Sequence, residues 1–454
     1  MTSKKDKRVC TGACIFGKCP FDECIKHKQG SIHKAVKADM SILTRGRLPV
    51  LKTNFDGYGI AIDIGTTTIA AYLYDYASGK CKDIKSVINP QVSFGVDVIS
   101  RIKYCRDKDS GLNELHDSIA KCLNNQITAL CISNNIDTDE VTKLSITGNT
   151  TMLCLMGNVD PSPMGVSPFE MPFGFGNVVQ AADLGLNIEA DVYLTHCMSS
   201  FVGGDIVSAV LSSGMRNSEV ALLLDIGTNG EVALFNKGEI LSSSTAAGPA
   251  FEGAELSCGM AAVAGAINSV DIYNGKIEVT TIGGHKPTGI CGSGVIDALA
   301  LMKKSGVMDE TGYIEESPHT IEVDGAPAFE VTKGVYITQK DVRQIQTAKS
   351  AIAAGVMALV NKAGLTFADV NTVYLAGGFG NYMDEANAVT IGLLPSETLN
   401  KLKSIGNAAG AGAGMTLDFG ENIKQCGIIA KSSSHVELAT DAYFMDKYVE
   451  CMMF

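Results

Sequence analysis

The fold is decided by two stretches of the sequence: Gly59-Ile60-Ala61-Ile62-Asp63-Ile64-Gly65-Thr66-Thr67-Thr68 and Val220-Ala221-Leu222-Leu223-Leu224-Asp225-Ile226-Gly227-Thr228-Asn229-Gly230. In each, an apolar run typical of a strand leads into Asp-Ile-Gly-Thr, and a second apolar run follows at once, Ile69–Tyr74 or Glu231–Phe235. The repetition of Asp-Ile-Gly-Thr about 160 residues apart indicates an internal duplication. We therefore predict two lobes with similar cores.

The Asp-x-Gly-Thr turn suits phosphate binding. Glycine lets the backbone approach a phosphate, turn N–H groups and threonine hydroxyls donate to its oxygens, and an aspartate at the strand end can hold hydrated Mg²⁺. One such turn would be an ordinary tight turn, but two copies in corresponding places favour a nucleotide site. The candidate residues are Asp63, Gly65, Thr66, Thr67 and Thr68 in the first hairpin and Asp225, Gly227, Thr228, Asn229 and Gly230 in the second.

A third element, Val373–Asn381, is predicted to be a buried strand that ends in a glycine-rich turn. Adjacent glycines leave a flat surface for an adenosine, so Gly377, Gly378 and Phe379 are candidate contacts. Helices are expected at 111–132, 205–214, 295–304, 340–363 and 408–417, from apolar spacing or from runs of small residues. Strands that alternate with helices predict an α/β fold with mixed sheets.

Together these elements resemble the actin, Hsp70 and sugar-kinase ATPase superfamily, whose landmarks occur here in the same order. The two connecting helices of that superfamily correspond to Gly204–Leu211, before the second hairpin, and Gly406–Ala413, after the adenosine turn. Small residues in both would let the helices cross closely at a hinge. The resemblance implies ATP and Mg²⁺ as ligands and a two-lobed fold. It also gives Asp205 and Asp225 catalytic roles, Asp205 by orienting the attacking water, although helix capping is an alternative for Asp205.

Length and composition agree with a protein of several domains. A chain of 454 residues exceeds one compact core, and 46% hydrophobic and 19% charged residues argue against global disorder. We expect a cysteine-rich head and connector at 1–50, a first lobe at 57–215 and a second lobe at 216–454. The net charge of −12 disfavours nucleic acid as a partner. With neither a secretion signal nor an apolar run long enough to span a bilayer, we expect a cytoplasmic location.

Four of the fourteen cysteines, Cys10, Cys14, Cys19 and Cys24, crowd into fifteen residues near the N-terminus. Four thiolates in so short a segment can surround one soft metal site, and we favour an iron–sulfur cluster. Zinc is an alternative, although zinc sites usually use pairs of cysteines separated by a longer loop. Free thiols are the remaining alternative.

Within the superfamily, residues 57–454 resemble the ATP-dependent reductive activators of corrinoid proteins. Six strings carry the resemblance: Ser93–Ile102, Gly148–Met152, Asp225–Glu231, Ala247–Ala254, Gly289–Gly294 and Thr338–Lys349. The resemblance implies ATP-driven reduction of Co(II) to Co(I) in the corrinoid protein of a methyltransferase system, with an electron donor such as ferredoxin or flavodoxin. A homodimer is a further expectation. The N-terminal cysteines depart from the plant-type [2Fe–2S] domain of many activators. A small-molecule kinase with Asp205 as base and an ATP-gated scaffold without catalysis stay open as alternatives.

Overall fold

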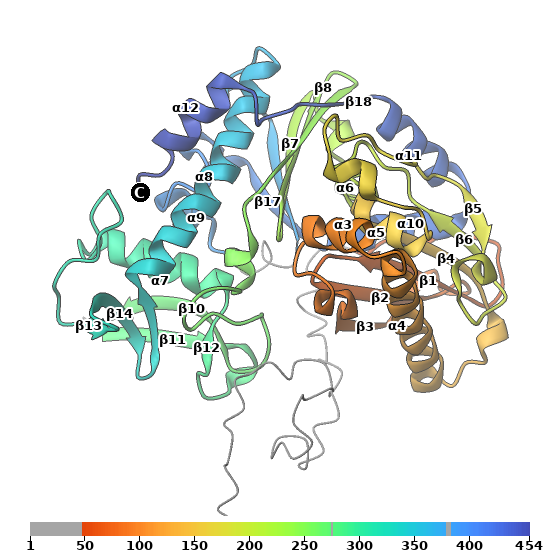
Figure 1. Cartoon of the computed structure of the whole chain (residues 1–454), viewed down its shortest axis with the longest axis horizontal. Coiled ribbons are helices and arrows are strands. Elements are labelled where there is room, and N and C mark those ends of the chain that lie inside the picture. The colour runs from red at the N-terminus through yellow and green to blue at the C-terminus, as the bar shows by residue number, and fades with distance from the viewer. Residues whose placement is uncertain (1–47, 274–275, 378–382) are drawn as a thin grey trace, which may run out of the picture.

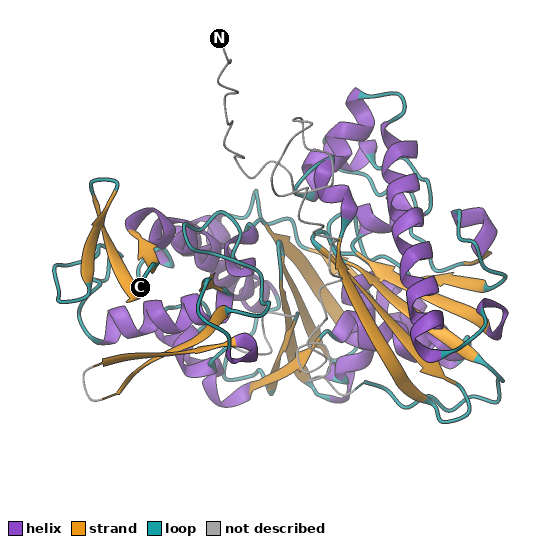
Figure 2. Cartoon of the chain, turned by 90° about the horizontal axis from the view of Figure 1, so that it is seen from below, coloured by secondary structure: helices purple, strands orange, loops and turns teal. Residues whose placement is uncertain are grey.

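The computed structural model describes residues 48–273, 276–377 and 383–454, which form two six-stranded and two three-stranded sheets (Figure 1). In Figure 2 the strands of the larger sheets run through the middle of the molecule with helices around them. The α/β fold with mixed sheets is therefore confirmed. The N-terminal segment that holds Cys10, Cys14, Cys19 and Cys24 lies outside the described residues.

The first large sheet has the strand order β3-β2-β1-β4-β6-β5. Its strands are β1 (Tyr58–Ile64), β2 (Thr68–Asp75), β3 (Lys80–Ile88), β4 (Val141–Gly148), β5 (Val178–Gln180) and β6 (Asp191–Leu194). β1, β2 and β3 form an antiparallel meander, whereas β1, β4 and β6 are parallel. The central strands β1 and β2 are apolar on both faces because both faces are covered.

The second large sheet repeats this plan in the order β17-β16-β7-β8-β9-β18. Its strands are β7 (Val220–Ile226), β8 (Gly230–Asn236), β9 (Glu239–Thr245), β16 (Thr372–Ala376), β17 (Leu402–Gly406) and β18 (Ser433–His435). β7, β8 and β9 form the meander, and β7, β16 and β17 are parallel. The five strands β3-β2-β1-β4-β6 thus correspond to β9-β8-β7-β16-β17, as the predicted duplication requires.

The helices expected from the sequence are present within a few residues of their expected ends. The α-helices of the described residues are α3 (Val98–Asp107), α4 (Gly111–Asn134), α5 (Thr150–Met156), α6 (Gly204–Ser213), α7 (Gly292–Lys304), α8 (Gln339–Lys362), α9 (Glu385–Thr390), α10 (Ala408–Met415), α11 (Glu421–Lys431) and α12 (Ala442–Glu450). α4 packs its apolar side chains on the first large sheet, and α8 packs on the second. Covering helices of this kind remove the apolar sheet faces from water, which drives folding.

The two connecting helices, α6 and α10, pack against each other. Each follows a strand of one large sheet and packs on the other large sheet. α6 follows strand β6 of the first sheet yet packs in a core with β7, β8 and β16 of the second. α10 follows β17 of the second sheet yet lies on the first, where a Cβ at Gly410 would approach the Tyr72 ring to 2.6 Å. At the helix crossing, a Cβ at Gly412 would lie 2.1 Å from the Ser208 carbonyl oxygen. Only glycine permits this approach, so the expected close crossing is confirmed.

Two small sheets lie on the far side of the second large sheet from the first (Figure 1). One consists of β10 (Ala266–Tyr273), β11 (Lys276–Thr281) and β12 (Gly289–Ile290), and the other of β13 (Thr320–Val323), β14 (Ala326–Thr332) and β15 (Val335–Thr338). They are inserted between β9 and α8, and their apolar residues join the same core as α8. The second half of the duplicated plan therefore carries two additional small sheets.

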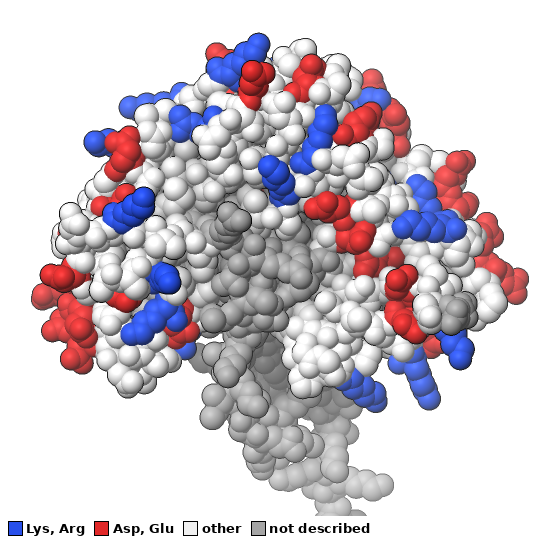
Figure 3. All heavy atoms as spheres, turned by 180° about the vertical axis from the view of Figure 1, so that it is seen from behind, with Lys and Arg blue, Asp and Glu red and all other residues white. Residues whose placement is uncertain are grey.

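The surface is of mixed charge on the face that Figure 3 shows, where Lys and Arg alternate with Asp and Glu and neither gathers in a broad patch. Among the described residues, no helix combines the length and the apolar character that crossing a membrane requires.

Candidate nucleotide site

The first hairpin has a four-residue turn, Gly65–Thr68, between the paired residues Ile64 and Ile69. The Gly65 N–H donates to the Thr68 carbonyl oxygen at 2.9 Å, so this amide closes the turn. A Cβ at Gly65 would lie 2.7 Å from the same oxygen, which explains the glycine. Thr66 is buried, Thr67 is half-buried and Thr68 is exposed at the start of β2.

Polar side chains from three separate elements donate hydrogen bonds to the turn of the first hairpin. The buried Arg101 of α3 donates through Nη2 to the Thr66 carbonyl oxygen at 2.5 Å and through Nε to the Gly95 carbonyl oxygen at 2.9 Å. Asn149 donates to the Thr66 hydroxyl at 3.0 Å. Asn89 donates to the Gly65 carbonyl oxygen at 2.8 Å. These bonds fix the turn and leave the Thr67 hydroxyl to face the second hairpin.

The second hairpin is one residue shorter, because Ile226 pairs with Gly230 across a three-residue turn. Its Gly227 N–H donates to the Asn229 carbonyl oxygen at 3.0 Å and again closes the turn. Gly230 is buried, and a Cβ there would lie 2.6 Å from the Thr245 hydroxyl oxygen. Thr228 and Asn229 are the residues whose side chains remain partly exposed at the tip.

Thr67 and Thr228 bring the two hairpins together. Their hydroxyl oxygens are 3.3 Å apart. Both donate to Oε2 of Glu252, at 3.1 Å from Thr67 and 2.9 Å from Thr228. Glu252 ends the short 3₁₀ helix Pro249–Glu252. The predicted phosphate donors of the two halves therefore converge on one point.

Carboxylates crowd around this point. Asp63 and Asp225 are the penultimate residues of the corresponding strands β1 and β7. Asp205 lies in the first turn of α6, and Glu231 lies opposite Asp225 in the hairpin. Burial raises the pKa of Asp63 to about 6, of Asp205 to about 7 and of Asp225 to about 8. Burial also raises the pKa of Glu231, with smaller contributions from the charges of Asp205 and Asp225.

Asp205 is the second residue of α6 and not its N-cap, which is Gly203. Its Oδ1 accepts a hydrogen bond from the Ile206 N–H at 2.8 Å. A negative charge in the first helical turn is favoured by the helix dipole. The carboxylate nevertheless belongs to the acidic group, since the charge of Asp63 contributes to its raised pKa.

The predicted adenosine turn begins beside the second hairpin. Gly377 has a φ of 91°, and a Cβ there would lie 2.7 Å from Oδ1 of Asp225. Parallel pairing of β16 with β7 produces this contact, because Ala376 pairs with Asp225. Gly378 and Phe379 lie outside the described residues.

A divalent cation fits the chemistry of the acidic group. No salt bridge of the described chain involves Asp63, Asp205 or Asp225, so their charges face one another without a protein cation. Among described residues, no three His, Cys, Asp or Glu side chains are arranged to ligate one ion directly. Mg²⁺ suits this arrangement because it keeps several water ligands and takes few carboxylates. Asp63 and Asp225 would hold it through such waters.

Sequence reasoning assigned no role to several residues that shape the site. Arg101, Glu231 and Glu252 lie in strings that carried the family resemblance, and Asn407 lies just before α10. Asn407 donates to Oδ2 of Asp63 at 2.8 Å and so ties the first strand to the second connecting helix. The sequence signal that could have identified them is a charged residue within an otherwise apolar or glycine-rich string. Their hydrogen-bond partners, however, are distant in sequence.

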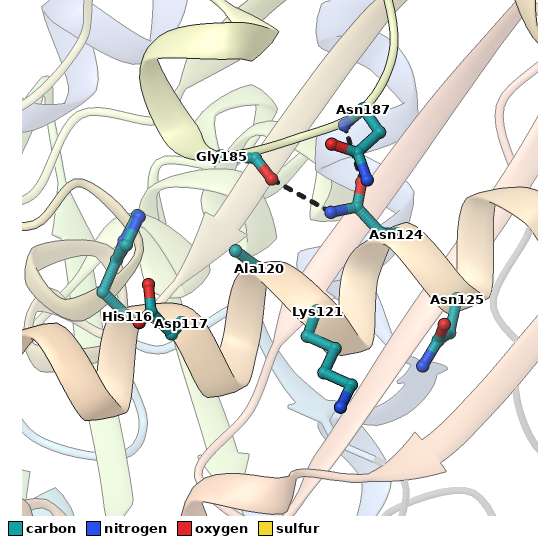
Figure 4. Close-up of a pocket in the computed structure, with 8 residues that line it drawn as sticks. All are labelled: His116, Asp117, Ala120, Lys121, Asn124, Asn125, Gly185 and Asn187. Carbon is teal, nitrogen blue, oxygen red and sulfur yellow. Dashed lines mark hydrogen bonds between the residues drawn. The ribbon is translucent and has the colours of Figure 1, made fainter.

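One surface pocket lies elsewhere, along α4 (Figure 4). There Asn124 donates to the Gly185 carbonyl oxygen at 2.9 Å and accepts from the Asn187 N–H at 2.8 Å. His116 and Lys121 also line it. None of the predicted nucleotide residues lines this pocket.

Comparison with known proteins places the chain in a family. Residues 219–454 match the family model described as the C-terminal domain of RACo, the ASKHA domain, and residues 58–218 match the RACo middle region. An ASKHA domain implies binding of ATP and Mg²⁺.

The chain is 37% identical over 420 residues to the corrinoid activation enzyme RamQ of Eubacterium limosum, covering 87% of this chain and 70% of that protein. It is 28% identical over 430 residues to the [Co(II) methylated amine-specific corrinoid protein] reductase of Methanosarcina barkeri, covering 86% and 76%. A solved structure of a reductive activator for corrinoid, iron–sulfur protein superposes with a TM-score of 0.82 at 36% identity, covering 89% and 67%. The chain therefore belongs to the RACo family.

Proposed function

We propose that this protein is an ATP-dependent reductive activator that returns the Co(II) of a corrinoid protein to Co(I). The observation that carries the proposal is the convergence of Thr67 and Thr228, from two duplicated hairpins, in a chain whose relatives are named for corrinoid activation. The reaction hydrolyses ATP to ADP and phosphate and transfers one electron to cobalt.

ATP is proposed to bind between the hairpins. Thr66, Thr67, Thr228 and the backbone of the two turns would surround the β- and γ-phosphates, and the turn that begins at Gly377 would carry the adenosine. Asp205 would orient the attacking water from the first turn of α6. Because α6 and α10 each link one sheet to the other, a small shift of either hairpin would be passed to both lobes, which is the hinge type of motion.

ATP binding would be coupled to electron transfer through differences in binding free energy. ATP shifts the reduction equilibrium only as far as the nucleotide-bound and nucleotide-free proteins differ in affinity for the two cobalt states. A tenfold shift in a one-electron equilibrium corresponds to about 59 mV, or about 1.4 kcal/mol. A modest difference in affinity for the partner is therefore sufficient to move the equilibrium noticeably.

The test is reduction of a Co(II) corrinoid protein by a strong one-electron donor, followed by the cobalt absorption spectrum. We expect reduction that depends on Mg-ATP and a slow ATPase activity that the corrinoid protein stimulates. The Asp205→Asn variant should bind ATP and lose hydrolysis. Hydrolysis at the wild-type rate would remove the catalytic role of Asp205. Phosphorylation of a small hydroxylated molecule, or nucleotide binding without turnover, would favour a kinase or a scaffold instead.

We also propose that Cys10, Cys14, Cys19 and Cys24 ligate one iron–sulfur cluster. Nearby Lys4, Lys5, Lys7, Arg8 and Lys18 would offset the negative charge of four thiolates and favour their deprotonation. When bound, such a cluster supplies one-electron transfer, and the electron source would be a ferredoxin or flavodoxin. Iron, sulfide and zinc analysis of anaerobically prepared protein checks this proposal.

Removal of residues 1–30 should leave ATP hydrolysis intact and abolish reduction of the corrinoid. Zinc without iron would contradict the cluster, and continued reduction by the truncated protein would assign the segment a structural or docking role. The oligomeric state, for which we propose a homodimer, is a separate measurement by sedimentation.

A further inference from the structure

One carboxylate already occupies the point where the two hairpins meet. Oε2 of Glu252 accepts hydrogen bonds from the hydroxyls of Thr67 and Thr228, at 3.1 and 2.9 Å. The backbone N–H of Thr228 also interacts with the Glu252 carboxyl group and offsets part of the effect by which burial raises its pKa. Three donors that the phosphate site needs, from both halves of the chain, are thus engaged by a single acidic side chain.

These donors cannot serve two acceptors at once. A threonine hydroxyl carries one proton, so a hydroxyl that donates to Glu252 has none left for a phosphate oxygen. Hydrogen bonds to a carboxylate are also about twice as strong as those between neutral groups. A phosphate that arrives between the hairpins must therefore displace the Glu252 carboxylate from them.

The surroundings of Glu252 are anionic. Asp225 lies close enough for its charge to interact with Glu252, and Asp225 in turn interacts with Asp63 and Asp205. The described chain pairs Glu252 with no Lys, Arg or His. A carboxylate in such a place is held by the two threonines and not by a neighbouring cation.

We infer that Glu252 is a stand-in for the nucleotide phosphate: its carboxylate joins the first hairpin to the second in the nucleotide-free protein and must leave before ATP binds. This inference rests on the ATP site of the proposed function and deepens it. Glu252 thereby lowers the affinity for nucleotides that carry a β-phosphate. When ATP binds, hydrogen bonds from Thr67 and Thr228 to the phosphates replace those to Glu252.

The affinity of a Glu252→Gln variant tests the inference. Glutamine keeps the size of the side chain and removes the charge that competes with phosphate. If the bridged state holds about 90% of the nucleotide-free protein, its loss raises the apparent affinity about tenfold. We expect calorimetric titration with Mg-ATP and Mg-ADP to show this gain, and titration with AMP, which has no β- or γ-phosphate, to show none.

Glu255→Gln is the matched control, because Glu255 is exposed three residues away and undergoes the same change of charge. Its affinities should equal those of the wild type. Should Glu252→Gln fail to fold, Glu252→Asp retains the charge but is too short to reach both hydroxyls together. It should bind Mg-ATP more tightly than the wild type, by less than tenfold.

A second readout needs no nucleotide. In the nucleotide-free protein, hydrogen exchange at the Thr228 amide should be faster in Glu252→Gln than in the wild type or Glu255→Gln. An unchanged or weaker affinity for Mg-ATP in Glu252→Gln would overturn the inference, as would unchanged exchange. If Mg-ATP binds the wild type normally, such a result leaves the proposed function standing. If the wild type binds no nucleotide, the proposed function falls as well.

Discussion

The two phosphate hairpins share Asp-Ile-Gly-Thr but lie in opposite electrostatic surroundings. The first rests on the Arg101 guanidinium and on two asparagine amides, all of them donors. The second carries a pair of opposed carboxyl groups, because Glu231 pairs with Asp225 across the hairpin. Glu252 accepts hydrogen bonds from both hairpins, through Thr67 and Thr228. In the first hairpin the residue opposite Asp63 is Ala70.

This difference indicates that the two duplicated hairpins have different roles. The first hairpin is held rigidly by neutral and positive groups. The second carries opposed carboxyl groups, and ionising both would place like charges directly across a strand pair, which destabilises it. We infer that the second half needs the cation and the nucleotide for its stability, whereas the first does not.

The largest expected effect comes from Asp225→Ala, which removes the second strand-end carboxylate. Ligand at one hundred times its dissociation constant stabilises a protein by about 2.7 kcal/mol, and we expect this variant to lose that stabilisation by Mg-ATP. The nucleotide-free variant should be no less stable than the wild type, because a buried carboxylate among like charges is removed. Thermal unfolding with and without Mg-ATP is the measurement. A wild-type shift with Mg-ATP would contradict the site.

Breaking the support of the first hairpin should cost stability even without nucleotide. Arg101→Met leaves the buried Thr66 carbonyl oxygen and the partly buried Gly95 carbonyl oxygen without their donor, and we expect this to cost about 2 kcal/mol. Urea unfolding measures the loss. Arg106→Met on the same helix is the control, since Arg106 is half exposed and, among the residues that the structure describes, forms an ion pair with Asp107 alone. Equal stability of the two variants would show that Arg101 does not hold the hairpin.

A smaller effect is expected where the adenosine turn approaches the second hairpin. Gly377→Ala places a Cβ against Asp225 in addition to the strain of a positive φ. Gly364→Ala is matched, because Gly364 has a φ of 67° but no atom within 4 Å of the added Cβ. Left-handed backbone costs a non-glycine residue about 1–2 kcal/mol, and we expect Gly377→Ala to exceed its control by about 1 kcal/mol. Mg-ADP affinity should fall only in Gly377→Ala.

The last difference between the hairpins concerns the pH dependence of the nucleotide-free protein. The folded pKa of Asp225 is raised from 3.8 to about 8 and that of Asp63 to about 6, so the folded state keeps protons that the unfolded state has released. Stability must then fall as pH rises from about 4, up to about 6 for Asp63 and about 8 for Asp225.

The melting temperature of Asp225→Asn should depend less on pH than that of the wild type between pH 6 and 8. For Asp63→Asn, we expect a weaker dependence only below pH 6. Asp369→Asn, at an exposed surface position, is the control. Equal profiles for Asp225→Asn and Asp63→Asn would remove the proposed difference between the hairpins.

The sequence predicted the plan of the fold closely. β1 and β7 end, as expected, at the isoleucine that follows Asp63 or Asp225 and precedes the glycine of the turn. α4, α6 and α8 begin within one residue of their expected starts. These features are local, since apolar periodicity and glycine decide where strands and helices begin. The domain limits and the roles of the site residues stay predictions.

By itself the sequence determined the duplication, the two hairpins and the small residues of the connecting helices, because short-range pattern encodes each of them. Only the tertiary structure decided which side chains surround each turn. Arg101 reaches Thr66 from 35 positions away, Glu252 reaches Thr67 from 185, and Asn407 reaches Asp63 from 344. No local pattern contains such contacts. These residues meet only because the two sheets and the crossing of α6 with α10 bring them together, so the different surroundings of two hairpins that share one motif are a property of the tertiary structure.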